Sequence, residues 1–161
     1  MKRLGVIADT HSREIPKQVL EDFKTVEFII HAGDFCLTSD FDKLAKVNVL
    51  KAVYGNMDEP ELRQKLPRRQ IISWEGFRLG VFHGDGPPQK LLGLVRDEFK
   101  NEKVNVIIFG HSHQPMNEKI NNVLWFNPGS PNDVVFAPYC SYGILEIQEK
   151  EIIGNIIKIK G

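Results

Sequence analysis

Short apolar runs alternate with polar segments in the N-terminal part of the chain. Three of these runs have the length of a buried strand: Leu4–Ala8, Phe28–Ala32 and Val47–Tyr54. Apolar residues at helical spacing predict a helix over residues 15–25. A second helix is expected over Ser39–Lys46, with Ser39 or Asp40 capping its first turn. This alternation of strands and helices predicts a parallel sheet with right-handed crossovers.

The pattern changes farther along the chain. Gln70–Trp74 and Phe77–Phe82 predict an antiparallel hairpin. A helix that opens at Pro87-Pro88 has an expected apolar face made of Leu91, Leu92, Val95 and Phe99. Further strands are expected at Val104–Phe109, in a hairpin around Asn121-Asn122, and at Tyr142–Ile147 and Ile152–Ile159. The sequence therefore predicts an α/β protein with parallel and antiparallel strands.

Composition and charge narrow the class of protein. The 161 residues are 42% hydrophobic and 26% charged, which suits one globular domain over residues 1–161. Because 21 Lys and Arg balance 21 Asp and Glu, we expect neither a nucleic acid polymer nor a membrane as partner. No apolar run approaches the roughly 20 residues of a membrane span. The first apolar run ends at Asp9, too early for a signal sequence, so we expect a cytoplasmic protein with Cys36 and Cys140 as free thiols.

Polar side chains directly follow five of the predicted strands. They are Asp9 and His11, Asp34, Asn56, His83, and His111 with His113. In open α/β sheets the carboxyl ends of the strands meet at one crevice, so we expect these side chains to gather there. Gly110-His111-Ser112-His113 is the most distinctive stretch, because side chains two residues apart after a strand reach into one crevice. Taken alone, it equally fits two solvated histidines in a polar loop.

These seven donors exceed the needs of a single ion. Four imidazoles without a thiolate favour Mn, Fe, Ni or Zn over Ca or Mg. Two ions that share a carboxylate lie about 3.5–4 Å apart, a spacing used for displacement at phosphorus. We therefore expect two divalent metal ions as cofactors, with Mn as the first choice and Ni, Fe or Zn as alternatives.

The order of the motifs resembles that of the calcineurin-like metallophosphoesterases. The chain carries the family's motifs in the family's order: Asp9-Thr10-His11, Gly33-Asp34, Gly55-Asn56, His83-Gly84 and Gly110-His111-Ser112-His113. The short chain and Asn127-Pro128-Gly129-Ser130 are similar to the small microbial phosphodiesterase branch. The resemblance implies two mixed β-sheets packed as a sandwich and flanked by helices in four layers, with a dinuclear site at one end.

The resemblance also implies how the ligands divide between two ions. One ion would be bound by Asp9, His11, Asp34 and His113, and the other by Asp34, Asn56, His83 and His111. Asp34 would then be the bridge. The implied reaction is hydrolysis of a small phosphodiester by a hydroxide that bridges the two ions, without a covalent intermediate. Asn56 and His111 would serve as catalytic residues as well as ligands.

Met57 departs from the family's pattern. Many members have a histidine there that protonates the leaving group or stabilises charge, and a thioether donates no proton. Loss of general acid catalysis costs about 10²–10⁴ in rate. We therefore expect slow turnover and leaving groups that are stable without a proton, such as aryl esters. Asp58 is a candidate for orienting a water or another donor, and equally suits a surface turn.

Other polar and apolar residues surround the predicted site. His31 is expected in the core or behind a metal ligand. Four arginines are candidates for binding phosphate: Arg13, Arg63, Arg68 and Arg69. Asp85 either supports a ligand or forms a turn. The apolar stretch Val134–Tyr139, in the 131–141 loop, favours a homo-oligomer, either dimer or tetramer, or folds back on the core.

Two functions other than hydrolysis are consistent with these motifs. A retromer subunit shares this fold as a protein-interaction scaffold, although a scaffold does not need all seven donors. A metal-containing protein that binds a phosphorylated ligand without hydrolysing it is the other, and Met57 is the residue that favours it. The complete set of donors favours the phosphodiesterase.

Overall fold

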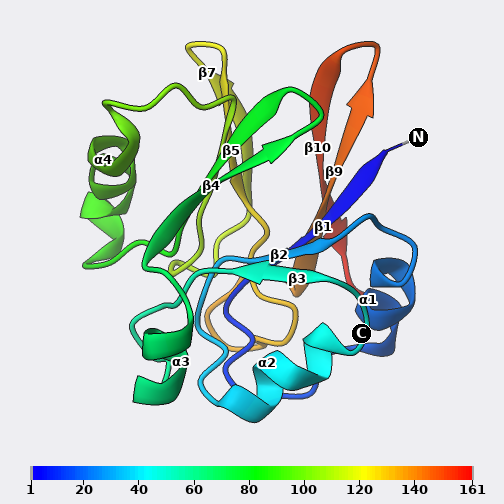
Figure 1. The fold of residues 1–161 in the computed structure, drawn as a ribbon. Coiled ribbons are helices and arrows are strands. Elements are labelled where there is room, and N and C mark those ends of the chain that lie inside the picture. The colour runs from blue at the N-terminus through cyan, green and yellow to red at the C-terminus, as the bar shows by residue number, and fades with distance from the viewer. Residues whose placement is uncertain (1, 161) are drawn as a thin grey trace.

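Two mixed five-stranded sheets form the centre of the computed structural model, which describes residues 2–160 (Figure 1). The first sheet has the strand order β10 (Glu151–Lys158), β9 (Ser141–Gln148), β1 (Arg3–Ile7), β2 (Ile29–His31) and β3 (Leu50–Ala52). β1, β2 and β3 pair in parallel, whereas β9 pairs antiparallel with β1 and with β10. The predicted βαβ segment therefore supplies three of the five strands of a larger, mixed sheet.

The second sheet has a parallel centre and antiparallel edges. Its strand order is β4 (Arg69–Trp74), β5 (Phe77–Phe82), β6 (Val106–Ile108), β8 (Val123–Asn127) and β7 (Met116–Ile120). β5, β6 and β8 run parallel, and the edge strands β4 and β7 run antiparallel to their neighbours. The hairpin between β7 and β8 turns at Asn121 and Asn122, whose φ angles of 49° and 66° suit a type I′ turn and confirm the prediction.

Three apolar clusters separate four layers. The central cluster lies between the sheets and includes Val6, Ile30, Val81 and Ile108. A second cluster packs α1 (Lys17–Phe23), α2 (Thr38–Ala45) and α3 (Pro60–Lys65) against the first sheet. A third packs α4 (Pro88–Phe99) on the second sheet, and Figure 1 shows α4 and α1 on opposite sides of the molecule. This sandwich of two mixed sheets with flanking helices confirms the expected fold class.

Burial on both sheet faces explains the continuous apolar runs. Successive side chains of a strand point to opposite faces. Val6 belongs to the cluster between the sheets and Ile7 to the cluster under the helices, and both are fully buried. A strand covered on both faces must be apolar at every position, which is the pattern that predicted β1 and β2.

Two local predictions are wrong, and one helix is not predicted. Neither Ser39 nor Asp40 caps α2, because Glu59 from a later loop accepts hydrogen bonds from the backbone N–H and hydroxyl of Thr38, at 3.1 and 2.6 Å. No predicted element covers α3, which begins at Pro60. Leu92 is 45% exposed, since the buried face of α4 is formed by Leu91, Val95 and Phe99.

The length and apolar character of the helices were compared with those of a membrane-spanning helix. Between residues 2 and 160, no helix has both the length and the apolar character that are needed to cross a bilayer.

Candidate metal centre

The predicted donors follow strands of both sheets. β1, β2 and β3 belong to the first sheet, whereas β5 and β6 belong to the second. Backbone hydrogen bonds join the loops, from Asp9 N–H to Gly33 O at 3.0 Å and from Gly110 N–H to His83 O at 3.1 Å. The Nδ1 atom of His83 lies 2.7 Å from Ala32 O and so connects the two sheets. The crevice is therefore formed where two sheets meet, and not by one sheet alone.

Gly110 allows the loops to approach this closely. A Cβ atom at this position would lie 2.9 Å from Asp9 Oδ2 and 3.0 Å from the Cβ of Ala8. A side chain would therefore push the histidine loop away from Asp9. The glycine is needed for close approach.

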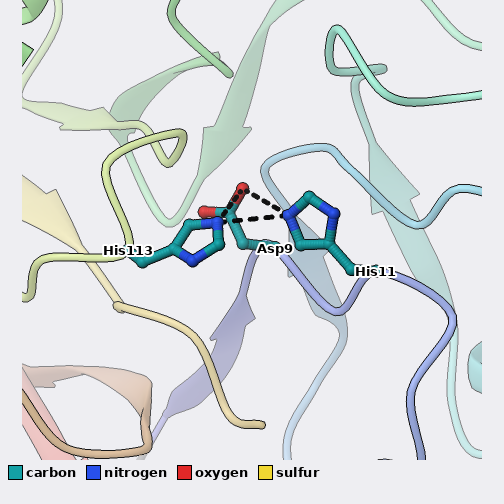
Figure 2. Close-up of side chains that lie close together, drawn as sticks. All are labelled: Asp9, His11 and His113. Atoms are coloured by element: carbon teal, nitrogen blue, oxygen red, sulfur yellow. Dashed lines mark hydrogen bonds and ion pairs between the residues drawn. The ribbon is translucent and has the colours of Figure 1, made fainter. Parts of the chain in front are cut away.

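One group of donors consists of Asp9, His11 and His113, which come from two loops far apart in the sequence (Figure 2). The Nε2 atoms of the two histidines lie 3.1 Å apart, and they lie 3.7 and 3.6 Å from Asp9 Oδ1. Ligands about 2.0–2.2 Å from one ion lie at such separations from one another. Three donors that converge in this way fit a divalent cation.

A second group consists of Asp9, Asp34 and His83. His83 Nε2 lies 3.1 Å from Asp34 Oδ2 and 3.7 Å from Asp9 Oδ1. His83 Nε2 and Asp9 Oδ1 are both buried, and neither makes a hydrogen bond within residues 2–160. Buried polar atoms normally have partners, so two unpartnered atoms that face one another fit ligands of a divalent cation.

The carboxylates of Asp9 and Asp34 are each close to donors of both groups. Asp9 belongs to each group, while Asp34 Oδ2 lies 3.6 Å from His11 Nε2 as well as 3.1 Å from His83 Nε2. The expected bridge, Asp34, is thus within reach of both halves of the site. Asp9 is within reach of both as well.

Outer contacts orient the four candidate histidines. His113 Nδ1 lies 2.6 Å from Asp133 Oδ2, and His83 Nδ1 lies 2.7 Å from a backbone carbonyl. Because carboxylate and carbonyl oxygens accept, each of these nitrogens carries the proton and leaves Nε2 free as a ligand. His11 Nδ1 lies 3.6 Å from Cys36 Sγ, and burial raises the pKa of that thiol to about 11.

His111 and Asn56 lie at the edge of the cluster. The ring of His111 is 5.3 Å from that of His83, and its backbone N–H donates to Asp9 Oδ2 at 3.0 Å. Its Nε2 lies 2.8 Å from Gly86 O, which leaves Nδ1 without a proton and available to a metal. Asn56 is exposed and lines a cavity of about 200 Å³ beside His83. The structure therefore brings five of the seven predicted donors together and leaves these two beside them.

Backbone strain is concentrated in the same loops. Five candidate ligands have positive φ angles between 46° and 73°: Asp9, His11, Asp34, His111 and His113. This left-handed conformation costs a residue other than glycine about 1–3 kcal/mol, and such residues cluster at functional sites. The strain indicates that ligand orientation, rather than stability, dictates the conformation of these loops.

The electrostatics favour cations. Burial by itself would raise the pKa of Asp9, but the charge of His83 and contacts with His11 and His113 hold it well below its usual range. Burial opposes the charge on His83, yet Asp9 and Asp34 raise its pKa to about 9. The Asp9 carboxylate, with Asp133, also raises the pKa of His113 to about 9. Because histidine ligands bind a metal in their neutral form, a divalent cation at this site would compete with protons for these imidazoles.

Asp58 supports the loops and does not face the cluster. It is almost fully buried, so the surface-turn interpretation is wrong. Its Oδ2 accepts the backbone N–H groups of Asp34 at 3.0 Å and Gly55 at 2.8 Å, and its Oδ1 accepts that of Cys36 at 2.7 Å. These contacts use both oxygens for backbone N–H groups of the surrounding loops, and the role of Asp58 in orienting a water or another donor stays a prediction.

His31 is a buried histidine of the core, as expected. Its Nδ1 accepts the N–H of Gly33 at 3.0 Å, and its Nε2 lies 3.1 Å from Thr10 Oγ1. Burial lowers its pKa to about 3, so the ring is neutral. It helps to shape the Asp9 and Asp34 loops without being a ligand.

Within residues 2–160 all four candidate arginines donate side-chain hydrogen bonds, although Arg13 donates only one, to Asn132 O at 3.4 Å. Arg63 donates to the backbone carbonyls of Asn56 and Asp58, while Arg68 and Arg69 form ion pairs on α4 or just beyond it. Arg13 lines a cavity next to His11 and His113. Arg63 therefore shapes the Asn56 loop, and Arg13 is the arginine that lies beside the first group of donors.

Asp133 is the residue that the sequence analysis missed. Its carboxylate is buried and bonds the imidazole of His113. No spacing rule links an aspartate in one loop to a histidine twenty residues earlier, so only the fold shows this pair.

A four-layer sandwich with carboxylates and imidazoles gathered at its strand ends is typical of a metal-binding protein of the α/β class. Residues 1–150 match the calcineurin-like phosphoesterase superfamily domain, and the chain belongs to this metal-dependent family. A probable metallophosphoesterase of Methanocaldococcus jannaschii is 36% identical over 156 residues, which cover 91% of this chain and 77% of that protein. A phosphodiesterase of the same organism is 30% identical over 172 residues, covering 92% of this chain and 95% of that protein.

Solved structures share the fold over nearly the whole chain. The solution structure of a Thermotoga maritima protein has a TM-score of 0.76 at 30% identity, covering 99% of this chain and 100% of that one. Vps29 of Entamoeba histolytica, complexed with Zn²⁺, has a TM-score of 0.72 at 22% identity, covering 97% and 98%. At this identity, the likeness to Vps29 shows the fold alone.

Proposed function

We propose that this protein is a metal-dependent phosphodiesterase that uses two divalent ions. The observation that carries the proposal is the pair of converging donor groups, which share Asp9, together with the orphaned atoms Asp9 Oδ1 and His83 Nε2 that lie 3.7 Å apart. Two groups that share a carboxylate suit a pair of ions better than a single one. The similarity to a phosphodiesterase of M. jannaschii supports a diester as substrate.

The proposed ligands are those that the family's pattern implies. Asp9, His11, Asp34 and His113 hold one ion, and Asp34, Asn56, His83 and His111 hold the other. When bound, a pair of divalent ions lowers the pKa of a water held between them and neutralises the phosphoryl oxygens. His111 contributes through Nδ1, since Gly86 O fixes the proton on Nε2. The mixed nitrogen and oxygen donors favour Mn, with Ni, Fe or Zn as alternatives.

Residues at the rim set the kind of ester that reacts. Asn56 is exposed beside His83, where its side-chain amide can donate to a phosphoryl oxygen. Met57 is 56% exposed and supplies no proton to a leaving group. The enzyme therefore favours diesters whose leaving group departs without protonation, and turnover is slow.

Asp58 acts by positioning and not by chemistry. Its carboxylate joins the Asp34 loop to the Gly55 loop through backbone N–H groups. The N–H of Met57 in turn donates to Asp34 Oδ1 at 2.8 Å. Asp34 is thereby held in one orientation, with Oδ2 toward His11 and His83.

Cytoplasmic location and a homo-oligomeric state, dimer or tetramer, are further parts of the proposal. The free thiols Cys36 and Cys140 motivate the first, and the exposed Val134, which does not line the pocket beside His113, motivates the second. They do not affect the chemistry proposed for the site.

The test uses metal-stripped protein given Mn, Ni, Zn or Mg in turn. The substrates are bis(p-nitrophenyl) phosphate and p-nitrophenyl phosphate. The variants are Asp34→Asn and His111→Ala, with Asp97→Asn on the exposed face of α4 as the matched control. We expect hydrolysis of the diester that requires a transition metal, is lost in both site variants and is kept in the control. A folded protein that binds two ions and hydrolyses neither ester would contradict the proposal and favour the scaffold or the non-hydrolytic binder.

A further inference from the structure

A small pocket adjoins the first group of donors. Its volume is about 220 Å³, and its lining includes His11, His113, Arg13, Val135 and Phe136. Sites for drug-sized ligands usually measure about 300–1,000 Å³. This pocket therefore has room for one part of a substrate whose phosphate lies at the metal centre.

Val135 and Phe136, which form the apolar wall of the pocket, are linked to the candidate metal ligand His113 through Asp133. Asp133 Oδ1 accepts the backbone N–H groups of Val135 at 2.8 Å and Phe136 at 3.0 Å, and its Oδ2 lies 2.6 Å from His113 Nδ1. The side chain of Gln114 also donates to Phe136 O at 3.2 Å. One buried carboxylate thus sets the position of the apolar wall relative to His113.

The apolar side chains of this wall face outward. Phe136 is 80% exposed and Val135 is 68% exposed, although both are anchored through their backbones. Adjacent large apolar side chains that stay exposed next to a binding site mark a surface for contact. Val134 is also 80% exposed, but it lines a different groove, with Pro16 and Tyr139. Val134 is therefore an exposed apolar residue of the same loop that does not line the pocket, which makes it a suitable control.

Arg13 gives the pocket a positive charge. Within residues 2–160 its guanidinium forms no ion pair with a carboxylate and makes a single hydrogen bond, to Asn132 O at 3.4 Å. A guanidinium that is free of acidic partners is suited to bind a phosphoryl oxygen. The pocket thus combines an anion-binding group with an aromatic face.

We propose that this pocket binds a flat aromatic ester group of the phosphodiester substrate, stacked on Phe136, while Arg13 contacts the phosphate. The inference rests on the proposed function and adds the class of substrate. Stacking on an exposed aromatic side chain tolerates many ring types, so both aryl groups and nucleobases suit the site. The loop is assigned to substrate and not to a second copy of the chain, because Val135 and Phe136 share their pocket with His11 and His113.

The test measures equilibrium binding to Mn-loaded protein by calorimetry. The probes are phenylphosphonate and methylphosphonate, which share the anion and differ in the ring. Aromatic contacts contribute enough to make the wild type bind phenylphosphonate about twofold to tenfold more tightly. Phe136→Ala should abolish this preference without weakening methylphosphonate, and Val134→Ala should keep it. Arg13→Gln should weaken both probes by similar factors.

Several results would overturn the inference. They are equal affinity of the wild type for the two phosphonates, no binding of either, and a phenyl preference that persists in Phe136→Ala. Sedimentation that shows a wild-type oligomer dissociated by Phe136→Ala would assign the loop to self-association and overturn it as well. The proposed function fails separately, when the wild type prefers phenylphosphonate but hydrolyses no diester. A nucleoside monophosphate as a third probe distinguishes a nucleobase from a simple aryl group.

Discussion

Replacing Asp58 by asparagine tests whether this residue stabilises the loops of the site or takes part in the reaction. The carboxylate of Asp58 accepts three backbone N–H groups, at 2.7, 2.8 and 3.0 Å. Asparagine has one acceptor oxygen, and its NH₂ group would face N–H donors where the other oxygen stood. One or two of the three contacts are therefore lost, and the donors left behind are buried.

The size of the effect follows from these contacts. A hydrogen bond to a charged group contributes about 1.5–3 kcal/mol, so Asp58→Asn should lower the free energy of unfolding by about 3 kcal/mol. For a chain of this length, about 2–4 °C of melting temperature corresponds to each kcal/mol, which gives a decrease of about 6–12 °C. The protein should still fold, since natural domains are stable by about 5–15 kcal/mol.

Urea denaturation and thermal melting of the metal-free variant measure this change. Asp97→Asn, on the exposed surface of α4, serves as the control and should leave stability unchanged. Hydrolysis of bis(p-nitrophenyl) phosphate is measured at a temperature at which both variants are folded. A variant of wild-type stability that has lost more than about a hundredfold in kcat would refute the clamp and make Asp58 a chemical participant.

Four other changes test the site. Asp133→Asn leaves one acceptor oxygen to serve both the His113 ring and the loop N–H groups, so it should weaken binding of the first metal ion about 10–100-fold by calorimetry, and unchanged affinity would contradict the role of Asp133. Met57→His restores a proton donor at an exposed position and should raise kcat by up to about 10², most for poor leaving groups. Gly110→Ala should destabilise the protein by about 1–3 kcal/mol, because its Cβ would lie 2.9 Å from Asp9 Oδ2. Finally, His83 has a pKa raised from 6.5 to about 9, so its stabilising effect is complete below pH 6.5 and is lost as pH rises through 9. The melting temperature of metal-free protein should fall over that range, whereas stabilisation by added metal should increase.

Much of the local structure follows from the sequence because it depends on neighbours in the chain. Continuous apolar runs predict β1 and β2, and the Asn121-Asn122 turn predicts the hairpin of β7 and β8. The cap of α2 does not follow, since the acceptor is Glu59, some twenty residues away. Helix α3 has a single buried apolar residue, Leu62, and so lacks the periodicity that a pattern can detect.

Some features of the candidate site likewise follow from the sequence, whereas others are seen only in the tertiary structure. The order and chemistry of the donors are properties of the sequence, and they are sufficient to predict a metal site at the strand ends. Only the tertiary structure decides that two sheets supply the donors, that Asp9 and His83 carry orphaned atoms, and that Asp58 holds loops instead of facing the crevice. The pairing of Asp133 with His113 belongs to this second kind as well. The reason is physical: strand ends are marked by local apolar patterns, whereas hydrogen bonds between loops depend on how the two sheets pack.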